Sequence, residues 1–172
     1  MRTIRCYMLI LFSLIVCCIF YACSNQKKID TIIEFVEQKN VISEFKGYTL
    51  YYRASGDEPG TSLIYVKKAN VECQPYIVLV DVENAKIIRI NNTDVIDTCQ
   101  KDYIGYQMIV KLVQKFLDSK LYYVSVDLDD TLYINPFTTE FACLIKKSKI
   151  PSSTPRNFEY FKRYKDDWYI RK

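Results

Sequence analysis

Residues 121–136 read LYYVSVDLDDTLYINP, and this stretch decides which type of sheet the chain can form. Apolar and polar side chains alternate on both sides of the acidic DLDD, as expected of two half-buried strands. The inward face of the first strand is expected to carry Tyr122, Val124, Val126 and Leu128, and the outward face Tyr123, Ser125 and Asp127. Aspartate is favoured in tight turns, so Asp129 and Asp130 suit the tip. The stretch therefore predicts an antiparallel hairpin.

The string DLDDTL also resembles the first motif of the haloacid dehalogenase superfamily, an apolar strand followed by Asp-x-Asp-x-Thr. The resemblance implies a Mg²⁺-dependent phosphatase in which Asp127 is the nucleophile and Asp129 the acid and base. Such a site needs a parallel sheet with alternating helices, and no clear helix follows Thr131. The hairpin is therefore preferred, with no catalytic residue and no metal. A metal-dependent hydrolase built on Asp127, Asp129 and Asp130 is the alternative.

Similar alternation elsewhere in the chain predicts further strands. The most apolar run, PYIVLVDV at residues 75–82, is expected to form the central strand, with residues 87–90 as its hairpin partner. The other expected strands cover residues 48–53, 61–68, 140–147, 158–164 and 167–172.

Two helices are expected, at residues 29–45 and 97–118. Capping-box spacing is found at Thr31 and Glu34 in the first and at Asp97 and Gln100 in the second. One face of the second helix carries Ile109, Leu112, Val113 and Phe116. The predicted class is α+β, with two helices packed on a mainly antiparallel sheet. The expected order is helix, about four strands, helix, and four or five strands.

The first 23 residues have the features of an export signal. Arg2 and Arg5 precede an apolar run from Tyr7 to Ala22, which is shorter than the ~20 residues that span a bilayer as a helix. The ending FYAC, residues 20–23, resembles a bacterial lipobox, and this implies cleavage before Cys23 and lipidation of its thiol. An uncleaved anchor helix, or a plain signal peptide with a chance cysteine, is the alternative.

These features predict three parts: a lipoprotein signal peptide at residues 1–22, a lipidated Cys23 with a polar tether to residue 28, and a single α+β domain at residues 29–172. The chain is similar to small exported lipoproteins of Bacteroidota. It is expected to be held to a bacterial cell envelope through lipid on Cys23. Ser24 rather than Asp follows Cys23, which favours the outer membrane. Once Arg2 and Arg5 are removed, 22 basic and 20 acidic residues remain, too mild a balance to predict nucleic acid as a partner.

Three cysteines lie beyond the signal and Cys23, namely Cys73, Cys99 and Cys143. The preferred interpretation is three buried small apolar side chains. One disulfide plus one free thiol is the alternative for an exported protein, with three pairings open. The chain has no histidine, so a transition-metal site and a Ser-His-Asp triad are not expected. No cofactor is expected.

Tyrosines on expected solvent faces are the best candidates for binding. Tyr51, Tyr123, Tyr133 and Tyr169 fall beside Arg53 and Arg171, and Tyr and Arg are enriched in binding hot spots. The alternative is that sheets favour tyrosine on half-buried faces. The tripeptides at Asp30 and Asp130 also resemble the Asp-Ser/Thr-apolar acceptor for O-glycosylation in Bacteroidota, which would place sugar on Thr31 or Thr131.

The sequence predicts a protein-binding lipoprotein of the envelope rather than an enzyme. In its size, its expected location in the envelope and its many expected strands, it resembles immunity proteins and inhibitors that neutralise a toxin or hydrolase. A metal-dependent envelope hydrolase with an acidic site, and a structural or assembly lipoprotein, are the alternatives.

Overall fold

The computed structural model describes residues 26–149 and 154–172. The chain divides into two compact units, residues 1–40 and 41–172. The described part of the first unit is a helix over residues 26–38. This helix includes residues 26–28 of the expected tether, and the Thr31 hydroxyl donates to the carbonyl of Lys27 instead of capping an end. Asn40 has φ of 51°, so the single helix predicted for residues 29–45 is wrong.

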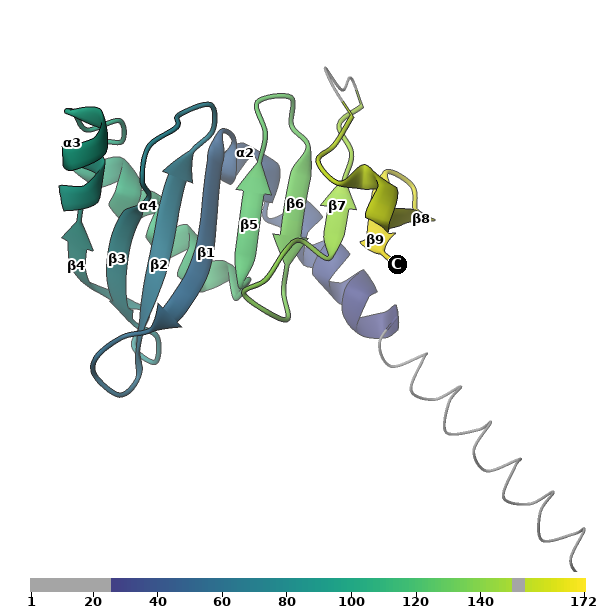
Figure 1. Cartoon of the computed structure of the whole chain (residues 1–172). Coiled ribbons are helices and arrows are strands. Elements are labelled where there is room, and N and C mark those ends of the chain that lie inside the picture. The colour runs from purple at the N-terminus through teal and green to yellow at the C-terminus, as the bar shows by residue number, and fades with distance from the viewer. Residues whose placement is uncertain (1–25, 150–153) are drawn as a thin grey trace, which may run out of the picture. The chain divides into compact units, whose positions relative to one another are not determined.

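The second unit begins with α2 (Val41–Phe45) and is dominated by one antiparallel sheet of nine strands (Figure 1). In chain order the strands are β1 (Tyr48–Ser55), β2 (Thr61–Lys68), β3 (Tyr76–Asp81), β4 (Lys86–Asn91), β5 (Tyr123–Val126), β6 (Leu132–Asn135), β7 (Leu144–Lys146), β8 (Phe161–Lys165) and β9 (Trp168–Arg171). Their order across the sheet is β4-β3-β2-β1-β5-β6-β7-β9-β8.

The predicted α+β class, with two helices on the sheet, is therefore wrong. The fold is β-rich, because the strands before and after the helical segment join into a single sheet. β1 pairs with β5 through Leu50 opposite Val124, and this one pairing connects the two groups of strands. Each group alone would leave a strand edge with unpaired backbone N–H and C=O groups, so joining them satisfies both edges.

The expected central strand is also wrong. β3 is the second strand from the β4 edge of the sheet. Its residues Tyr76, Val78 and Val80 are buried, and the residues between them are half-buried. The middle of the sheet is β5, in which Val124, Ser125 and Val126 are all buried. The most apolar run in the sequence is therefore a strand with one well-buried face, whereas the central strand, β5, is buried on both faces.

The second predicted helix, residues 97–118, is wrong in its extent. It consists of α3 (Thr93–Cys99) and α4 (Tyr106–Ser119), separated at Gln100, which has φ of 59°. Asp97 lies within α3 and Gln100 ends it, so they do not form a capping box. The intervening loop is held to the sheet because the Tyr76 hydroxyl accepts hydrogen bonds from the backbone N–H groups of Tyr103 and Ile104.

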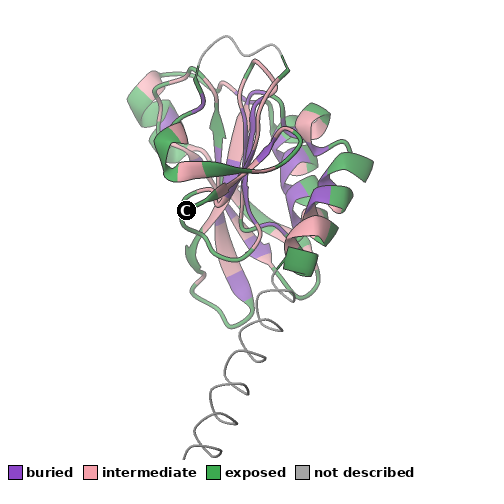
Figure 2. Cartoon of the chain, turned by 90° about the vertical axis from the view of Figure 1, so that its right-hand side faces the viewer, coloured by how far each residue is buried: buried purple, intermediate pink, exposed green. Residues whose placement is uncertain are grey.

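Helix α4 packs on one face of the sheet, behind it in Figure 1. Its predicted apolar stripe is confirmed, because Ile109, Leu112, Val113 and Phe116 are buried. The Phe116 ring lies 5.3 Å from that of Tyr52, so Tyr52 and Leu50 of β1 face the helix. Figure 2 shows the buried residues lining the strands. The largest side chains of this core are Trp168, Phe45, Phe116, Leu50, Ile64 and Leu112.

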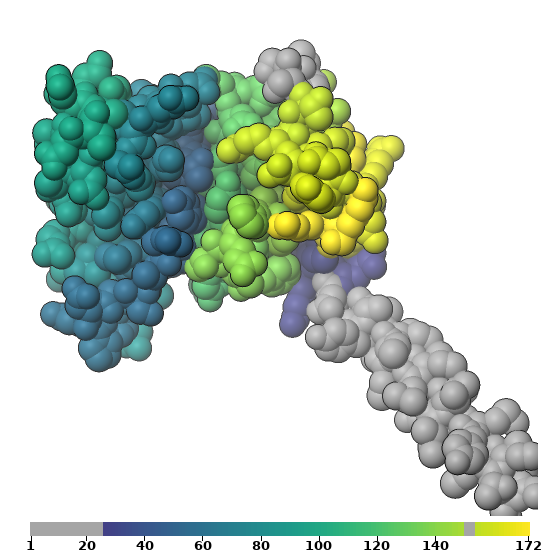
Figure 3. Space-filling view, viewed as in Figure 1, coloured from purple at the N-terminus to yellow at the C-terminus, as the bar shows by residue number. Residues whose placement is uncertain are grey.

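The opposite face of the sheet, called the outer face here, is partly covered by the chain's own C-terminal segment. Residues 154–157 lead into a 3₁₀ turn, η1 (Phe158–Tyr160), and then into β8. The expected strand at residues 158–164 is therefore helical in its first three residues. Figure 3 shows this yellow-green segment lying over the outer face. The segment and the strands under it form the candidate site.

Candidate functional site

The acidic DLDD stretch is the tip of the β5–β6 hairpin, as predicted. Strands β5 and β6 pair antiparallel, and the Asp127 N–H donates to the Thr131 carbonyl to close the turn. Asp130 at the tip has φ of 69°, a conformation that Asp tolerates better than most residues. Within the hairpin, Tyr122 and Leu128 were predicted on the inward face but are exposed, although the Tyr122 ring lies 5.6 Å from that of Tyr52, which faces the helix.

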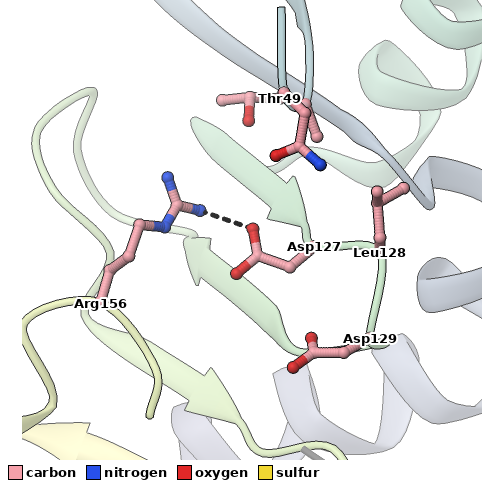
Figure 4. A pocket seen from close by; sticks show the side chains of 7 residues that line it. Thr49, Asp127, Leu128, Asp129 and Arg156 are labelled. Carbon is pink, nitrogen blue, oxygen red and sulfur yellow. Dashed lines mark hydrogen bonds and ion pairs between the residues drawn. The ribbon is translucent and has the colours of Figure 1, made fainter. Parts of the chain in front are cut away.

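Cations pair with carboxylates at this tip. Arg156 Nη2 lies 3.0 Å from Asp127 Oδ1 in the small cavity shown in Figure 4, and Lys46 Nζ lies 2.7 Å from Asp130 Oδ1. Asp129 accepts a hydrogen bond from the Thr131 N–H. The Arg156 guanidinium already pairs with Asp127 Oδ1, and a cation at this carboxylate would repel a Mg²⁺ ion, so the site does not suit the phosphatase chemistry. Within residues 26–149 and 154–172, no three acidic or thiol groups are placed to hold one ion.

The register places five of the six predicted binding residues on the outer face. Tyr51 lies opposite Tyr123, and Tyr133 and Tyr169 both lie opposite Ile145. Arg171 is two residues beyond Tyr169 and shares its side of β9. Side chains that are directly opposite in an antiparallel pair point to the same face, so these residues from four strands form one surface.

The sixth predicted residue, Arg53, lies apart from this surface. It falls at the irregularity in the β1–β2 register between Tyr52 and Ala54, where the alternation of β1 is interrupted. It lines a different groove, with a volume of about 860 Å³, between the end of β1 and the end of α4. Tyr52, Leu117 and Tyr122 line the same groove.

The predicted tyrosines are less exposed than expected. Tyr133 is buried, because the Arg156 guanidinium lies over its ring at 4.6 Å and its hydroxyl accepts a hydrogen bond from the Arg156 N–H. Tyr51, Tyr123 and Tyr169 are half-buried. Burial raises the pKa of Tyr51, Tyr123 and Tyr133, so these phenols are neutral at physiological pH. The prediction of a solvent-facing position is wrong for Tyr133.

A groove on the outer face collects most of these residues, and we call it the aromatic groove. It has a volume of about 490 Å³ and is lined by Tyr123, Tyr133, Phe141, Ala142, Arg156, Asn157, Tyr160, Phe161 and Arg171. The Phe141 side chain is 71% exposed and Tyr160 is 54% exposed, so both present aromatic surface to solvent. Such exposed aromatic surface at a groove is typical of an interaction site.

The inner wall of the groove is held by Arg156. Its guanidinium donates to Ser125 Oγ and to Asp127 Oδ1, both at 3.0 Å. Ser125 is buried and in turn lies 2.6 Å from the Thr49 hydroxyl of β1. Burial alone would lower the pKa of Arg156, but Asp127 and the neighbouring phenols outweigh it, so the pKa is raised. Arg156 therefore fixes segment 154–160 on β5 and β6 as a permanent cation.

The rim of the groove is held by Asn135, which is buried at the end of β6. Its side-chain oxygen accepts from the N–H groups of Phe137 and Thr138, and its side-chain nitrogen donates to the Phe141 carbonyl at 2.8 Å. These bonds order the loop between β6 and β7. Phe141 is therefore exposed on an ordered loop, which lowers the entropy lost when a partner binds.

Sequence reasoning did not identify Asn135, Phe141, Arg156 or Tyr160 as site residues. A usable signal was present in NPFTTEF at residues 135–141, where two phenylalanines stand in a polar, turn-rich segment. Apolar residues in such a segment are either packed under it or offered to a partner. Arg156 had no comparable local signal, because its partners lie on strands 29 and 31 residues earlier.

The cysteine interpretation is corrected by the structure. Cys73 and Cys99 form a disulfide, so the three-thiol interpretation is wrong. The bond joins the loop before β3 to the end of α3. Cys143 is free and half-buried, and burial raises the pKa of its thiol to about 11. It is therefore neutral and weakly nucleophilic at pH 7.

The predicted lipidation site, Cys23, lies outside the described residues. Thr131, one of the two suggested glycosylation sites, is 1% exposed, so a sugar could not be accommodated there in the folded chain. Thr31 is exposed on its helix. In the part of the chain that the structure describes, every helix is too short or too polar to span a bilayer.

Comparisons with protein-family models, with curated proteins and with solved structures give no match to this chain.

Proposed function

We propose that this protein is a lipoprotein of the bacterial envelope that acts by binding another protein through the aromatic groove. In this proposal lipid on Cys23 holds the chain to the outer membrane, and the groove is the working surface. The role is of the kind performed by immunity proteins and inhibitors, which occupy a toxin or hydrolase without catalysing a reaction.

The observation that carries the proposal is the pair of exposed aromatic side chains on an ordered groove. Phe141 and Tyr160 are 71% and 54% exposed, whereas the groove beneath them is fixed by buried Asn135 and by Arg156. Exposure of an aromatic side chain to water is unfavourable by about 25 cal/mol per Å² of apolar surface and does not stabilise the fold. A partner that covers both rings recovers this free energy.

Two further features agree with an exported binding protein. The disulfide between Cys73 and Cys99 is of a kind that persists outside the reducing cytosol. At the acidic tip, Arg156 and Lys46 neutralise two carboxylates, which disfavours the competing hydrolase. The structural or assembly alternative makes no use of the groove and has no specific observation in its favour.

The test is affinity capture with matched variants. The full chain is exported, purified in detergent and tagged within the exposed β1–β2 loop at residues 57–60, because the C-terminus adjoins the groove. Envelope and secreted proteins of the source are then offered to wild type, Phe141→Ala and Tyr106→Ala. Tyr106 is 64% exposed at the start of α4 and serves as a control for losing an exposed aromatic elsewhere.

The expected result is one stoichiometric partner captured by wild type and by Tyr106→Ala, and lost or strongly reduced with Phe141→Ala. Removal of a central aromatic contact typically lowers affinity by ~30-fold or more. Equal capture by all three proteins, or no partner in repeated trials, would overturn the proposal. Substrate and metal screens at Asp127 and Asp129 would then take priority.

A further inference from the structure

The inference concerns the chemistry of the partner and rests on the proposed function. The last 32 residues, 141–172, contain nine basic and three acidic residues, a net charge of +6. Residues 24–140 contain 13 basic and 17 acidic residues, a net charge of −4. The segment that supplies most of the groove is therefore basic, whereas the rest of the mature chain is acidic.

Arg171 differs from Arg156 in its surroundings within the groove. It is exposed on β9, and its guanidinium carbon lies 5.6 Å from the centre of the Phe141 ring. Among the described residues no acidic side chain is paired with Arg171, whereas Arg156 is paired with Asp127. The two arginines therefore have different roles: Arg156 holds the groove together, and Arg171 is available to a ligand.

The position of Arg171 on Phe141 prepares it to bind a carboxylate. A guanidinium held near the face of an aromatic ring by cation–π attraction loses part of its rotational freedom but keeps its N–H donors for a further partner. A carboxylate can then accept two parallel hydrogen bonds from it. Because Phe141 is itself ordered through Asn135, less side-chain entropy is lost than for a freely rotating surface arginine.

We propose that the aromatic groove binds an acidic segment of the partner protein. A glutamate or aspartate of that segment pairs with Arg171, and an adjoining apolar side chain packs against Phe141 and Tyr160. The basic surface of residues 141–172 attracts the segment and sets its orientation, because opposite charge across an interface raises the association rate and excludes basic competitors.

The neighbouring sheet edge is a poor alternative route for such a segment. Strand β8 is the last strand in the order of the sheet, so it forms one of its edges. The register of β8 is irregular between Arg163 and Lys165, and Lys162 and Lys165 are exposed along it. Irregular, lysine-bearing edges resist the addition of a further strand. Recognition is therefore assigned to side chains of the groove.

The test uses two labelled peptides and the full chain in detergent. One peptide alternates glutamate with phenylalanine and has blocked termini; the other has glutamine in place of every glutamate. Binding is measured by fluorescence anisotropy at low and high salt, with wild type, Arg171→Gln and Arg89→Gln. Arg89 is exposed on β4 at the opposite edge of the sheet, so its substitution changes net charge equally at a distant place.

Wild type and Arg89→Gln are expected to bind the glutamate peptide ~10-fold or more tightly than the glutamine peptide, as for a lost charged hydrogen bond. Arg171→Gln is expected to keep only a small preference for the glutamate peptide, due to the remaining basic residues of 141–172, and to lose that preference at high salt. The Arg171 side chain is exposed and its main-chain bond to the Cys143 carbonyl is unaffected, so an unchanged melting temperature confirms that the variant is folded.

Three results would overturn the inference: equal binding of both peptides by wild type, equal loss in the two arginine variants, or no binding of either peptide. The proposed function fails separately. If the captured partner depends on Phe141 but is retained by Arg171→Gln, the groove binds protein and only the acidic chemistry is wrong. If capture is independent of Phe141, the groove itself is not the site.

Discussion

Removing the disulfide should lower the stability of this protein far more than removing its free thiol. Cys73 and Cys99 are 26 residues apart, and the chain-entropy relation gives about 3.5 kcal/mol for a closed loop of this length at 25 °C. The bond also ties the end of α3 to the loop before β3, next to the Tyr76 hydroxyl that holds Tyr103 and Ile104. Loss of the bond should loosen α3 before the rest of the sheet.

The perturbation is Cys73→Ser combined with Cys99→Ser, so that no unpaired cysteine is left behind. For a domain of about 150 residues each kcal/mol corresponds to about 2–4 °C, so the melting temperature should fall by about 7–14 °C. Circular dichroism during heating and urea unfolding measure the change. Cys143→Ser is the control, and its effect should be less than about 1 kcal/mol because the Cys143 thiol makes only one weak hydrogen bond, of 3.6 Å, to Asn135.

Thiol counting provides an independent check. After unfolding without reductant, a chain lacking residues 1–23 should expose one reactive thiol, that of Cys143. Three reactive thiols, or a double variant as stable as the control, would refute the reasoning. The first result would show that the disulfide does not form, and the second that it does not constrain the unfolded chain.

Three further predictions follow from single side chains. Asn135→Ala should lower the free energy of unfolding in urea by about 2–3 kcal/mol, because buried hydrogen bonds to the β6–β7 loop are lost. Amide hydrogen exchange at residues 137–138 should become faster, and unchanged exchange would contradict this prediction. Hydrogen bonds from Asn84 lower the pKa of Asp81, so the ionised Asp81 stabilises the folded chain above pH 3.8, the ordinary pKa of this group. The difference in unfolding free energy between wild type and Asn84→Ala, measured in urea, should therefore be largest above pH 3.8 and disappear as the pH falls through the lowered pKa. A difference that does not change with pH would argue against the bond. Burial raises the pKa of Cys143 to about 11, so less of the thiol is ionised in the native protein than in the unfolded chain. Iodoacetamide, which reacts with the thiolate, should therefore modify the native thiol ~100-fold more slowly at pH 7 than the unfolded one. Equal rates would show that the thiol is not buried.

The local parts of the fold were open to prediction from sequence. Each expected strand segment overlaps one observed strand, because the alternation of apolar side chains is a property of neighbouring residues. The acidic hairpin at Asp127–Asp130 was predictable for the same reason, since turn chemistry acts within a few residues. The break between α3 and α4 was not, because it depends on contacts to Tyr76 and Cys73, which lie well before it in the chain.

The candidate site was open to prediction only in part. Enrichment of Tyr and Arg identified Tyr123, Tyr133 and Arg171, which do line one groove. It also selected Arg53, which the register irregularity in β1 directs to another groove. Composition cannot separate these cases, because which face a side chain occupies depends on the register of every strand between it and the site.

By itself the sequence determined where the strands and the hairpin tip lie, and that residues 141–172 are basic and aromatic. Only the tertiary structure decided that these strands form one sheet with β5 at its centre. That outcome depends on β1 pairing with β5, where Thr49 and Ser125 meet across 76 residues of chain. A strand has the same two-residue period at the edge of a sheet as at its middle, so no local pattern can reveal its neighbours. The covering of the outer face by Arg156, which buries Tyr133, is likewise a contact between residues far apart in the chain.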